Sequence, residues 1–174
     1  MRLLYLLRHA KSNWDELGLP DAERPLAKRG RKAAKLMAKH LRRAGIEPAV
    51  VLCSPAKRAK ETLALVAPAF DNASVIFDQR IYEASYQTLL ACLAELPAEA
   101  GSALLLGHNP GLDRLAAYLM DEHGDDRATE RLHEKFPTSA LAVLSTEADW
   151  RGMRAGCCRL EDFIRPTDLD AESD

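Results

Sequence analysis

Short runs of apolar residues alternate along the chain with longer segments in which apolar positions recur every three or four residues. The apolar runs lie at 3–7, 50–53, 75–77, 103–106 and 140–144. Runs of this length predict buried strands, and the segments between them predict helices. Strands that alternate with helices are typical of a mostly parallel sheet covered on both faces. The pattern therefore predicts an α/β protein built as a three-layer α/β/α sandwich.

Four helices are expected in the segments that link these strands. The first spans 28–45 and ends at Gly45, a residue type that favours the C-terminal ends of helices. The second follows Pro55 and reaches about residue 66 or 69, and the third covers about 86–96. The fourth follows Pro110 and ends near residue 120. Each helix thus connects two successive strands, as parallel pairing requires.

Three further segments carry weaker signals. Residues 121–135 are densely charged and show no apolar face, which predicts an exposed loop or a short exposed helix. Residues 152–158 are expected to add an edge strand. The acidic segment 166–174 has few apolar residues and is expected to be disordered. We therefore expect a single domain over 1–165 followed by an acidic tail.

The composition is that of an ordinary globular protein. With 174 residues, 47% hydrophobic residues and a net charge of −2, the chain can form one sizeable core, and we expect no nucleic-acid or membrane partner. No apolar run approaches the ~20 residues that cross a bilayer, and no export signal is visible. The cysteines have no metal or disulfide spacing, which favours free thiols in a reducing cytoplasm. A monomer is compatible with these features, and the oligomeric state stays open.

Cationic and imidazole side chains follow three of the predicted strands. Arg8 and His9 come directly after the first strand, Arg58 lies about one turn into the helix after the second, and His108 follows the fourth. Because the C-terminal ends of parallel strands meet at one edge of a sheet, we expect these side chains to lie close together.

Two helix N-termini are expected to point at the same edge. Ser54 and Asn109 are the predicted N-caps, with Pro55 and Pro110 in the first helical positions. The free backbone N–H groups of such helix ends attract anions. The edge of the sheet is therefore predicted to bind an anionic ligand.

Two arginines and two histidines favour a phosphoryl group as that ligand. A metal site usually mixes His with Asp, Glu or Cys, which these strand ends lack, and an adjacent guanidinium would oppose the cation. The Gly-rich loops of nucleotide-binding folds are also missing. A neutral histidine can attack phosphorus, and neighbouring arginines disfavour its protonation while they stabilise charge on the transferred oxygens.

These segments carry a family resemblance. LLYLLRHAKS, SPAKRAKET and LLLGHNPG resemble the histidine phosphatase superfamily, whose fold is phosphoglycerate-mutase-like. RPLAKRG (24–30), YEAS (82–85) and PTSALAVL (137–144) resemble its SixA-type phosphohistidine phosphatase branch. The resemblance covers nearly the whole chain, and its motifs are jointly specific.

The resemblance implies roles for the residues at the strand ends. His9 would be the nucleophile that becomes phosphorylated and is then hydrolysed by water. Arg8 and Arg58 would clamp the phosphoryl oxygens, and His108 would complete the pocket. Neither a metal nor an organic cofactor is implied. Ala10 departs from the family pattern, because a glycine usually follows the nucleophile.

Three further residues have two interpretations each. Glu83 matches the position of a glutamate in mutase-like members, so it is either the general acid or a polar residue at a helix start. Ser12 either donates to a phosphate oxygen or is a loop serine. Arg24 either contacts the substrate from the pocket rim or is solvated.

The leading functional hypothesis is a metal-independent phosphatase that works through a covalent phosphohistidine, with a phosphohistidine-bearing protein as substrate. A short chain has little sequence for a lid over a small metabolite, which favours a protein substrate. The first alternative is a phosphatase of small phosphate esters, which would need Glu83 as acid. The second alternative is a module that binds a phosphorylated protein without turnover.

Overall fold

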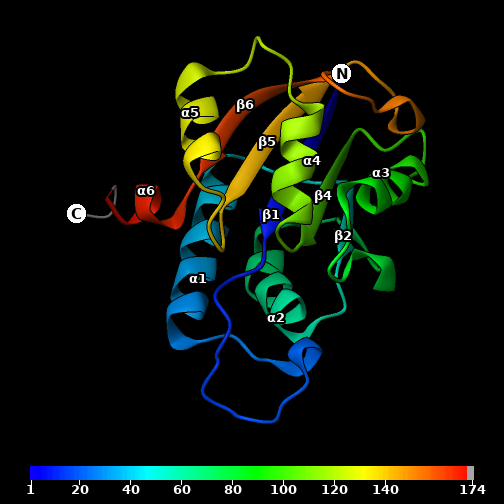
Figure 1. Cartoon of the computed structure of the whole chain (residues 1–174). Helices are drawn as coiled ribbons and strands as arrows, with labels where there is room; N and C mark the ends of the chain where they lie inside the picture. The colour runs from blue at the N-terminus through cyan, green and yellow to red at the C-terminus, as the bar shows by residue number, and fades with distance from the viewer. Residues whose placement is uncertain (172–174) are drawn as a thin grey trace.

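The computed structural model describes residues 1–171 as one six-stranded sheet with helices on both faces (Figure 1). The strands are β1 (Arg2–Arg8), β2 (Val50–Cys53), β3 (Ser74–Phe77), β4 (Ser102–Gly107), β5 (Leu141–Thr146) and β6 (Cys158–Ile164). The helices are α1 (Lys28–Arg43), α2 (Lys57–Val66), α3 (Tyr86–Ala94), α4 (Gly111–Leu119), α5 (Asp126–Glu134) and α6 (Pro166–Ala171). The predicted three-layer α/β/α architecture is confirmed.

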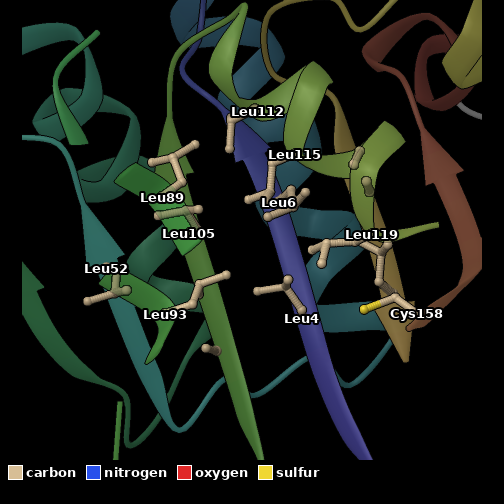
Figure 2. Close-up of a cluster of buried hydrophobic side chains, with 14 of the residues drawn as sticks. Leu4, Leu6, Leu52, Leu89, Leu93, Leu105, Leu112, Leu115, Leu119 and Cys158 are labelled. Carbon is tan, nitrogen blue, oxygen red and sulfur yellow. The ribbon is translucent and has the colours of Figure 1, made fainter. Parts of the chain in front are cut away.

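Strand β1 lies inside the sheet and is buried on both faces. Leu4 and Leu6 belong to a core formed with α3, α4 and α5, where they meet leucines of α3 and α4 (Figure 2). Tyr5 and Leu7 belong to a second core formed with α1, α2 and α6. Each leucine side chain removed from water contributes about 1.5–3 kcal/mol. Burial on both faces explains why the apolar run of β1 is continuous rather than alternating.

The strand order is β3-β2-β4-β1-β5-β6, and β3, β2, β4 and β1 run parallel. In register, Arg8 lies opposite Gly107 and Cys53 lies opposite Leu106, so the C-terminal ends of β1, β4 and β2 are level. Strand β5 runs antiparallel to β1. The segment that precedes β5 therefore reaches the same edge, which gathers four parts of the chain in one place.

The predicted N-caps do not occupy the N-cap positions. Helix α2 begins three residues after Ser54 and helix α4 begins two residues after Asn109, so the N-cap residues are Ala56 and Pro110, which make no side-chain cap. Oδ1 of Asn109 still accepts the N–H of Asp113 in the first turn of α4 at 3.2 Å. The Ser54 hydroxyl lies 2.7 Å from Nε2 of His108, so it serves the edge of the sheet rather than the helix. Both helices nevertheless start at that edge, as predicted.

The charged segment 121–135 has an apolar face after all. It contains α5, in which Ala128 and Leu132 are buried against the sheet. Its other seven positions are polar or charged, which hid this narrow face in the sequence. The edge strand β6 also begins later than expected, at Cys158. A 3-10 turn, η4 (Trp150–Gly152), and a turn with the left-handed Gly156 come before it.

The segment predicted to be a disordered tail starts with helix α6. Leu169 is buried in the second core, with 7% of its surface exposed. Asp168 pairs with Arg165 at 3.0 Å. The acidic composition masked the single leucine that attaches this helix. Residues 172–174 lie outside the described residues.

The helices and cysteines of residues 1–171 can be compared with what the composition predicted. None of the helices there is both long and apolar enough to cross a membrane. All four cysteines are free thiols, and Cys53, Cys92 and Cys158 are buried, as predicted.

Candidate active site

A cavity of about 340 Å³ opens at the edge of the sheet where β1, β2 and β4 end. Its wall contains the four side chains that the strand ends were predicted to bring together, Arg8, His9, Arg58 and His108. The ring centroids of the two histidines lie 5.1 Å apart. Of these residues, His9 and Arg58 are 7% exposed and His108 is 5% exposed. The predicted cluster of two cations and two imidazoles therefore exists and is largely withdrawn from water.

The hydrogen bond of His9 defines which of its ring nitrogens is free. Nδ1 lies 2.7 Å from the carbonyl oxygen of Ala10. Because a carbonyl oxygen only accepts, the proton of the neutral ring lies on Nδ1 and the lone pair lies on Nε2. Burial, aided by the charges of Arg58 and Arg8 and opposed by the Ala10 hydrogen bond, lowers the pKa of His9 to about 4. The ring is therefore neutral near pH 7, which nucleophilic attack requires.

Arg58 is held by an acidic partner from the loop after β1. Its Nη1 donates to the main-chain oxygen of Asp21 at 2.8 Å, and its Nη2 donates to Oδ2 of the same residue at 3.0 Å. The Tyr82 hydroxyl donates to that carboxylate oxygen as well. The Tyr82 hydrogen bond and then those of Arg58 lower the pKa of Asp21, so the carboxylate stays ionised. Arg58 is thus fixed in orientation before any ligand arrives.

Arg8 is anchored on one side only. Its Nη1 donates to the carbonyl oxygen of Phe136 at 3.0 Å, and the same oxygen accepts Nδ2 of Asn109 at 2.9 Å. Nη2 of Arg8 makes no hydrogen bond to residues 1–171. The segment before β5 therefore orients a guanidinium that keeps donors for a ligand.

His108 is oriented by Ser54 and Arg58. Nε2 lies 2.7 Å from Oγ of Ser54, and Nδ1 lies 3.4 Å from Nη2 of Arg58. Burial, followed by the neighbouring His9 and Arg58, lowers the pKa of His108 to about 3. Like His9, it is a neutral ring near pH 7 and acts as a hydrogen-bonding group rather than a third cation.

Comparison with known proteins agrees with this geometry. The model of the histidine phosphatase superfamily (branch 1) matches residues 4–111. The chain belongs to this superfamily. It is 39% identical over 163 residues to the uncharacterized protein Rv1276c of Mycobacterium tuberculosis (strain ATCC 25618 / H37Rv), which covers 92% of this chain and 99% of that protein.

Two solved structures narrow the assignment within the histidine phosphatases. The proposed phosphohistidine phosphatase SixA of Nakamurella multipartitia is 30% identical, with a TM-score of 0.81 over 95% of this chain and 96% of that one. The protein histidine phosphatase SixA complexed with tungstate is 25% identical, with a TM-score of 0.75 over 96% and 99% of the two chains. The protein is a SixA-type histidine phosphatase and therefore a phosphohydrolase, in a superfamily whose members are generally metal-independent.

Ala10 fits this histidine phosphatase without strain. It is fully buried and its φ is not positive, so the site does not need the conformational freedom of glycine. Its N–H donates to Oγ1 of Thr62 at 2.9 Å, and that hydroxyl donates to the carbonyl oxygen of Arg58 at 2.7 Å. The residue beside His9 thus links β1 to the helix that carries Arg58.

Glu83 also lines the cavity of this histidine phosphatase. It is exposed and its φ is +51°, in the left-handed region that non-glycine residues rarely occupy. The carbonyl oxygen of the next residue, Ala84, packs on Gly111, where a Cβ would lie 2.3 Å from that oxygen. This contact holds the Glu83 loop against the start of α4, at the mouth of the cavity.

Ser12 and Arg24 differ in their relation to the cavity. Ser12 lines it, is 8% exposed, and its hydroxyl has no hydrogen-bond partner within residues 1–171. Arg24 does not line it. Its guanidinium carbon lies 3.3 Å from the ring centroid of Trp14 and its Nε lies 3.5 Å from Asp21, so it supports two residues of the wall from behind.

Sequence reasoning missed several wall residues of this histidine phosphatase. Lys11, Trp14, Asp21 and Thr138 line the cavity and were not among the predicted site residues. The adjacency of Asp21 to the RPLAKRG segment was a signal that could have drawn attention to it. The described residues contain no group of three or more His, Cys, Asp or Glu that could hold a metal ion.

Proposed function

We propose that this enzyme removes the phosphoryl group from phosphohistidine on a protein, through a phosphohistidine formed on its own His9. The observation that carries the proposal is a neutral His9 whose Nε2 is free, beside two guanidinium groups in a largely buried cluster. The relatives described as SixA support the substrate, and the tungstate complex supports an oxyanion in such a pocket.

In the first half of the cycle, Nε2 of His9 attacks the phosphorus atom and the bond from phosphorus to the substrate nitrogen breaks. A proton goes to the leaving imidazole. Arg8, with its free Nη2, and the fixed Arg58 stabilise charge on the transferred oxygens. Ser12 donates to one of those oxygens through its unpartnered hydroxyl.

In the second half, water attacks phosphorus and the bond to Nε2 of His9 breaks, which releases inorganic phosphate and regenerates the ring. His108 assists both halves by orienting Arg58. A guanidinium nitrogen can only donate, so Nδ1 of His108 accepts from Nη2 of Arg58 at 3.4 Å and the ring proton lies on Nε2. That N–H donates to Oγ of Ser54 at 2.7 Å, and the same oxygen accepts the N–H of Ala56 at 3.2 Å.

The second candidate is the hydrolysis of small phosphate esters, and Glu83 favours it. A carboxyl group on the cavity wall, on a residue held in the left-handed region, is placed to protonate an alkoxide leaving group. Phosphohistidine needs less of this help, because its leaving imidazole departs readily once it is protonated. For either substrate, we assign Arg24 the role of holding Trp14 and Asp21 in place rather than of contacting the substrate.

Two measurements test the proposal. After brief exposure to substrate and rapid quenching, wild type is expected to carry acid-labile phosphate, whereas His9→Ala carries none and loses at least about 10³-fold in kcat. Full activity in His9→Ala would disprove the nucleophile assignment.

The substrate class is tested with matched phosphohistidine and phosphoserine peptides. Glu83→Gln is expected to slow phosphoserine hydrolysis more than phosphohistidine hydrolysis. Glu99→Gln serves as the control, because Glu99 is exposed and does not line the cavity. A wild type that prefers phosphoserine would favour the ester phosphatase instead.

A further inference from the structure

Helix α1 concentrates positive charge on a chain that is otherwise acidic. It carries eight of the 24 Lys and Arg residues and none of the 26 Asp and Glu residues. All eight cationic side chains are exposed. Lys28, Lys32, Lys35 and Lys39 recur every three or four residues and therefore form one stripe along the helix. We call these four lysines together with Arg29 the α1 basic face.

This charge pattern lowers the stability of helix α1. Lys28 and Arg29 lie in the first turn, where the helix dipole favours acidic residues, and the N-cap Ala27 has no side-chain hydrogen bond. Like charges four residues apart along the stripe repel one another. A charge arrangement that lowers the stability of its own helix is expected at functional sites.

The rest of the described chain does little to neutralise the α1 basic face. Lys32 lies 4.0 Å from Asp170, and no other ion pair within residues 1–171 involves a member of the face. Lys28, Arg29, Lys35 and Lys39 are therefore available to an external anion.

The α1 basic face is continuous with the active site. The N–H of Ala27 donates to the carbonyl oxygen of Lys11 at 2.8 Å, and a Cβ on Gly30 would lie 2.2 Å from that same oxygen. Lys11 and Thr138 line the catalytic cavity and also a neighbouring cleft of about 330 Å³, whose wall includes Arg29 and Lys32. A substrate seated in the cavity would thus have its adjoining surface beside α1.

We propose that the α1 basic face docks an acidic surface of the phosphohistidine protein, next to its phosphorylated histidine. This inference rests on the proposed function. The face spans residues 28–39 and is therefore about 17 Å long, since a helix rises ~1.5 Å per residue. An acidic patch on a folded protein, or about five extended residues, matches that length.

A nucleic acid fits these observations less well. The chain outside α1 is net negative, so a long polyanion that extended beyond the helix would meet repulsion. The cavity at the end of the face holds a nucleophile for a terminal phosphoryl group, which the middle of a polynucleotide does not offer. A compact acidic surface avoids both difficulties.

The test compares two phosphohistidine peptides, one flanked by glutamates and one flanked by glutamines. The variant Lys28→Glu, Lys35→Glu, Lys39→Glu is expected to lose at least about 10-fold in kcat/KM for the glutamate peptide, mainly through KM. Turnover of the glutamine peptide and of phosphoramidate is expected to stay near the wild-type value. Wild-type kcat/KM for the glutamate peptide is also expected to fall with salt.

Folding of the variant is checked by its Tm, which is expected to stay within a few degrees of wild type. The Lys28 change places an acid in the first turn, opposite in charge to Lys32, whereas positions 35 and 39 exchange one like-charged pair for another. The matched control, Arg127→Glu, Arg151→Glu, Arg154→Glu, makes the same change in net charge outside α1 and is expected to leave both peptides unaffected.

The docking proposal is overturned if wild type turns over both peptides equally, or if the control variant loses as much as the α1 variant. An oligonucleotide that inhibits glutamate-peptide turnover more strongly than a glutamate peptide of equal charge would overturn the choice of partner. Failure of wild type to hydrolyse phosphoramidate or either peptide would instead overturn the proposed function.

Discussion

In the cavity that contains His9, Arg58 is tied to Asp21 by two hydrogen bonds and is 7% exposed. On α1, by contrast, Lys28, Lys35 and Lys39 are exposed and have no acidic partner among the described residues. The two cationic regions meet at Lys11, which lines both the cavity and the adjoining cleft. Their charges have the same sign but act over different ranges.

The difference follows from burial. Two unit charges 4 Å apart interact by about 1 kcal/mol in water and by about 4 kcal/mol in the partly buried surroundings of a protein. The fixed arginines can therefore act on the few oxygens of a single phosphoryl group. The exposed lysines are screened within ~10 Å at moderate salt, so they suit the attraction and orientation of a whole surface.

The largest expected difference between the two regions is in kcat/KM for the small substrate phosphoramidate. Arg58→Ala is expected to lower kcat/KM by about 10²–10³-fold, because it removes a pre-oriented donor to the transferred oxygens. Lys35→Ala is expected to leave this value nearly unchanged. Steady-state kinetics of both variants at two salt concentrations provide the measurement.

Arg58→Lys refines the same comparison. It keeps the charge but cannot form both hydrogen bonds to Asp21, so an intermediate loss is expected. Equal losses in Arg58→Ala and Lys35→Ala would mean that charge alone matters and that burial does not separate the two regions.

The second expected difference between the two regions is in how the free energy of unfolding depends on pH. Burial lowers the pKa of His9 to about 4, whereas an unfolded histidine titrates near 6.5. Below about pH 6.5 the unfolded chain binds a proton that the folded chain refuses, so the free energy of unfolding falls as the pH drops from about 6.5 toward 4. His108 adds to this trend, since burial lowers its pKa to about 3.

Urea unfolding of wild type and His9→Asn between pH 7 and pH 4.5 measures this effect. Wild type is expected to show a steeper pH dependence by ~1.4 kcal/mol per pH unit, the value for one proton. Lys28→Gln, Lys35→Gln, Lys39→Gln is the control for the exposed region and is expected to retain the wild-type slope. A wild-type slope in His9→Asn would show that His9 binds its proton equally in both states.

The smallest expected effect is that of Ala10→Gly. Ala10 is buried, packs in a cluster with Leu26 and Ala34 and has no positive φ. Glycine therefore loses one buried methyl group and gives extra freedom to the unfolded chain. The free energy of unfolding is expected to fall by about 1–2 kcal/mol, visible as a Tm lower by a few degrees. The turnover of phosphoramidate is expected to stay near wild type, and a rise in Tm would contradict this account.

The elements that the sequence predicted best are those with uninterrupted apolar runs. Strand β2 forms over the predicted residues, and Arg8, His9, Arg58 and His108 meet because strand order and direction bring their strand ends together. Parallel pairing can be inferred from alternating strands and helices, so this part of the site was predictable.

The missed part of the site comes from contacts that no local pattern encodes. Thr138 lines the cavity and the Phe136 carbonyl holds Arg8 because β5 runs antiparallel to β1, a direction that its apolar run does not reveal. Asp21 acts on Arg58 from 37 positions away, and Ser54 serves His108 instead of capping α2. A side chain such as Ser54 can cap a helix or bind another side chain, and only the folded structure shows which of the two it does.

Gly30 has a consequence for how this enzyme can diversify. Any larger residue there would collide with the Lys11 backbone, so the close approach of α1 to the loop after His9 requires glycine. A descendant of this protein that kept Gly30 could exchange the exposed side chains of α1 and still keep this approach. On the docking proposal, partner choice and phosphoryl chemistry would then be inherited as separate traits.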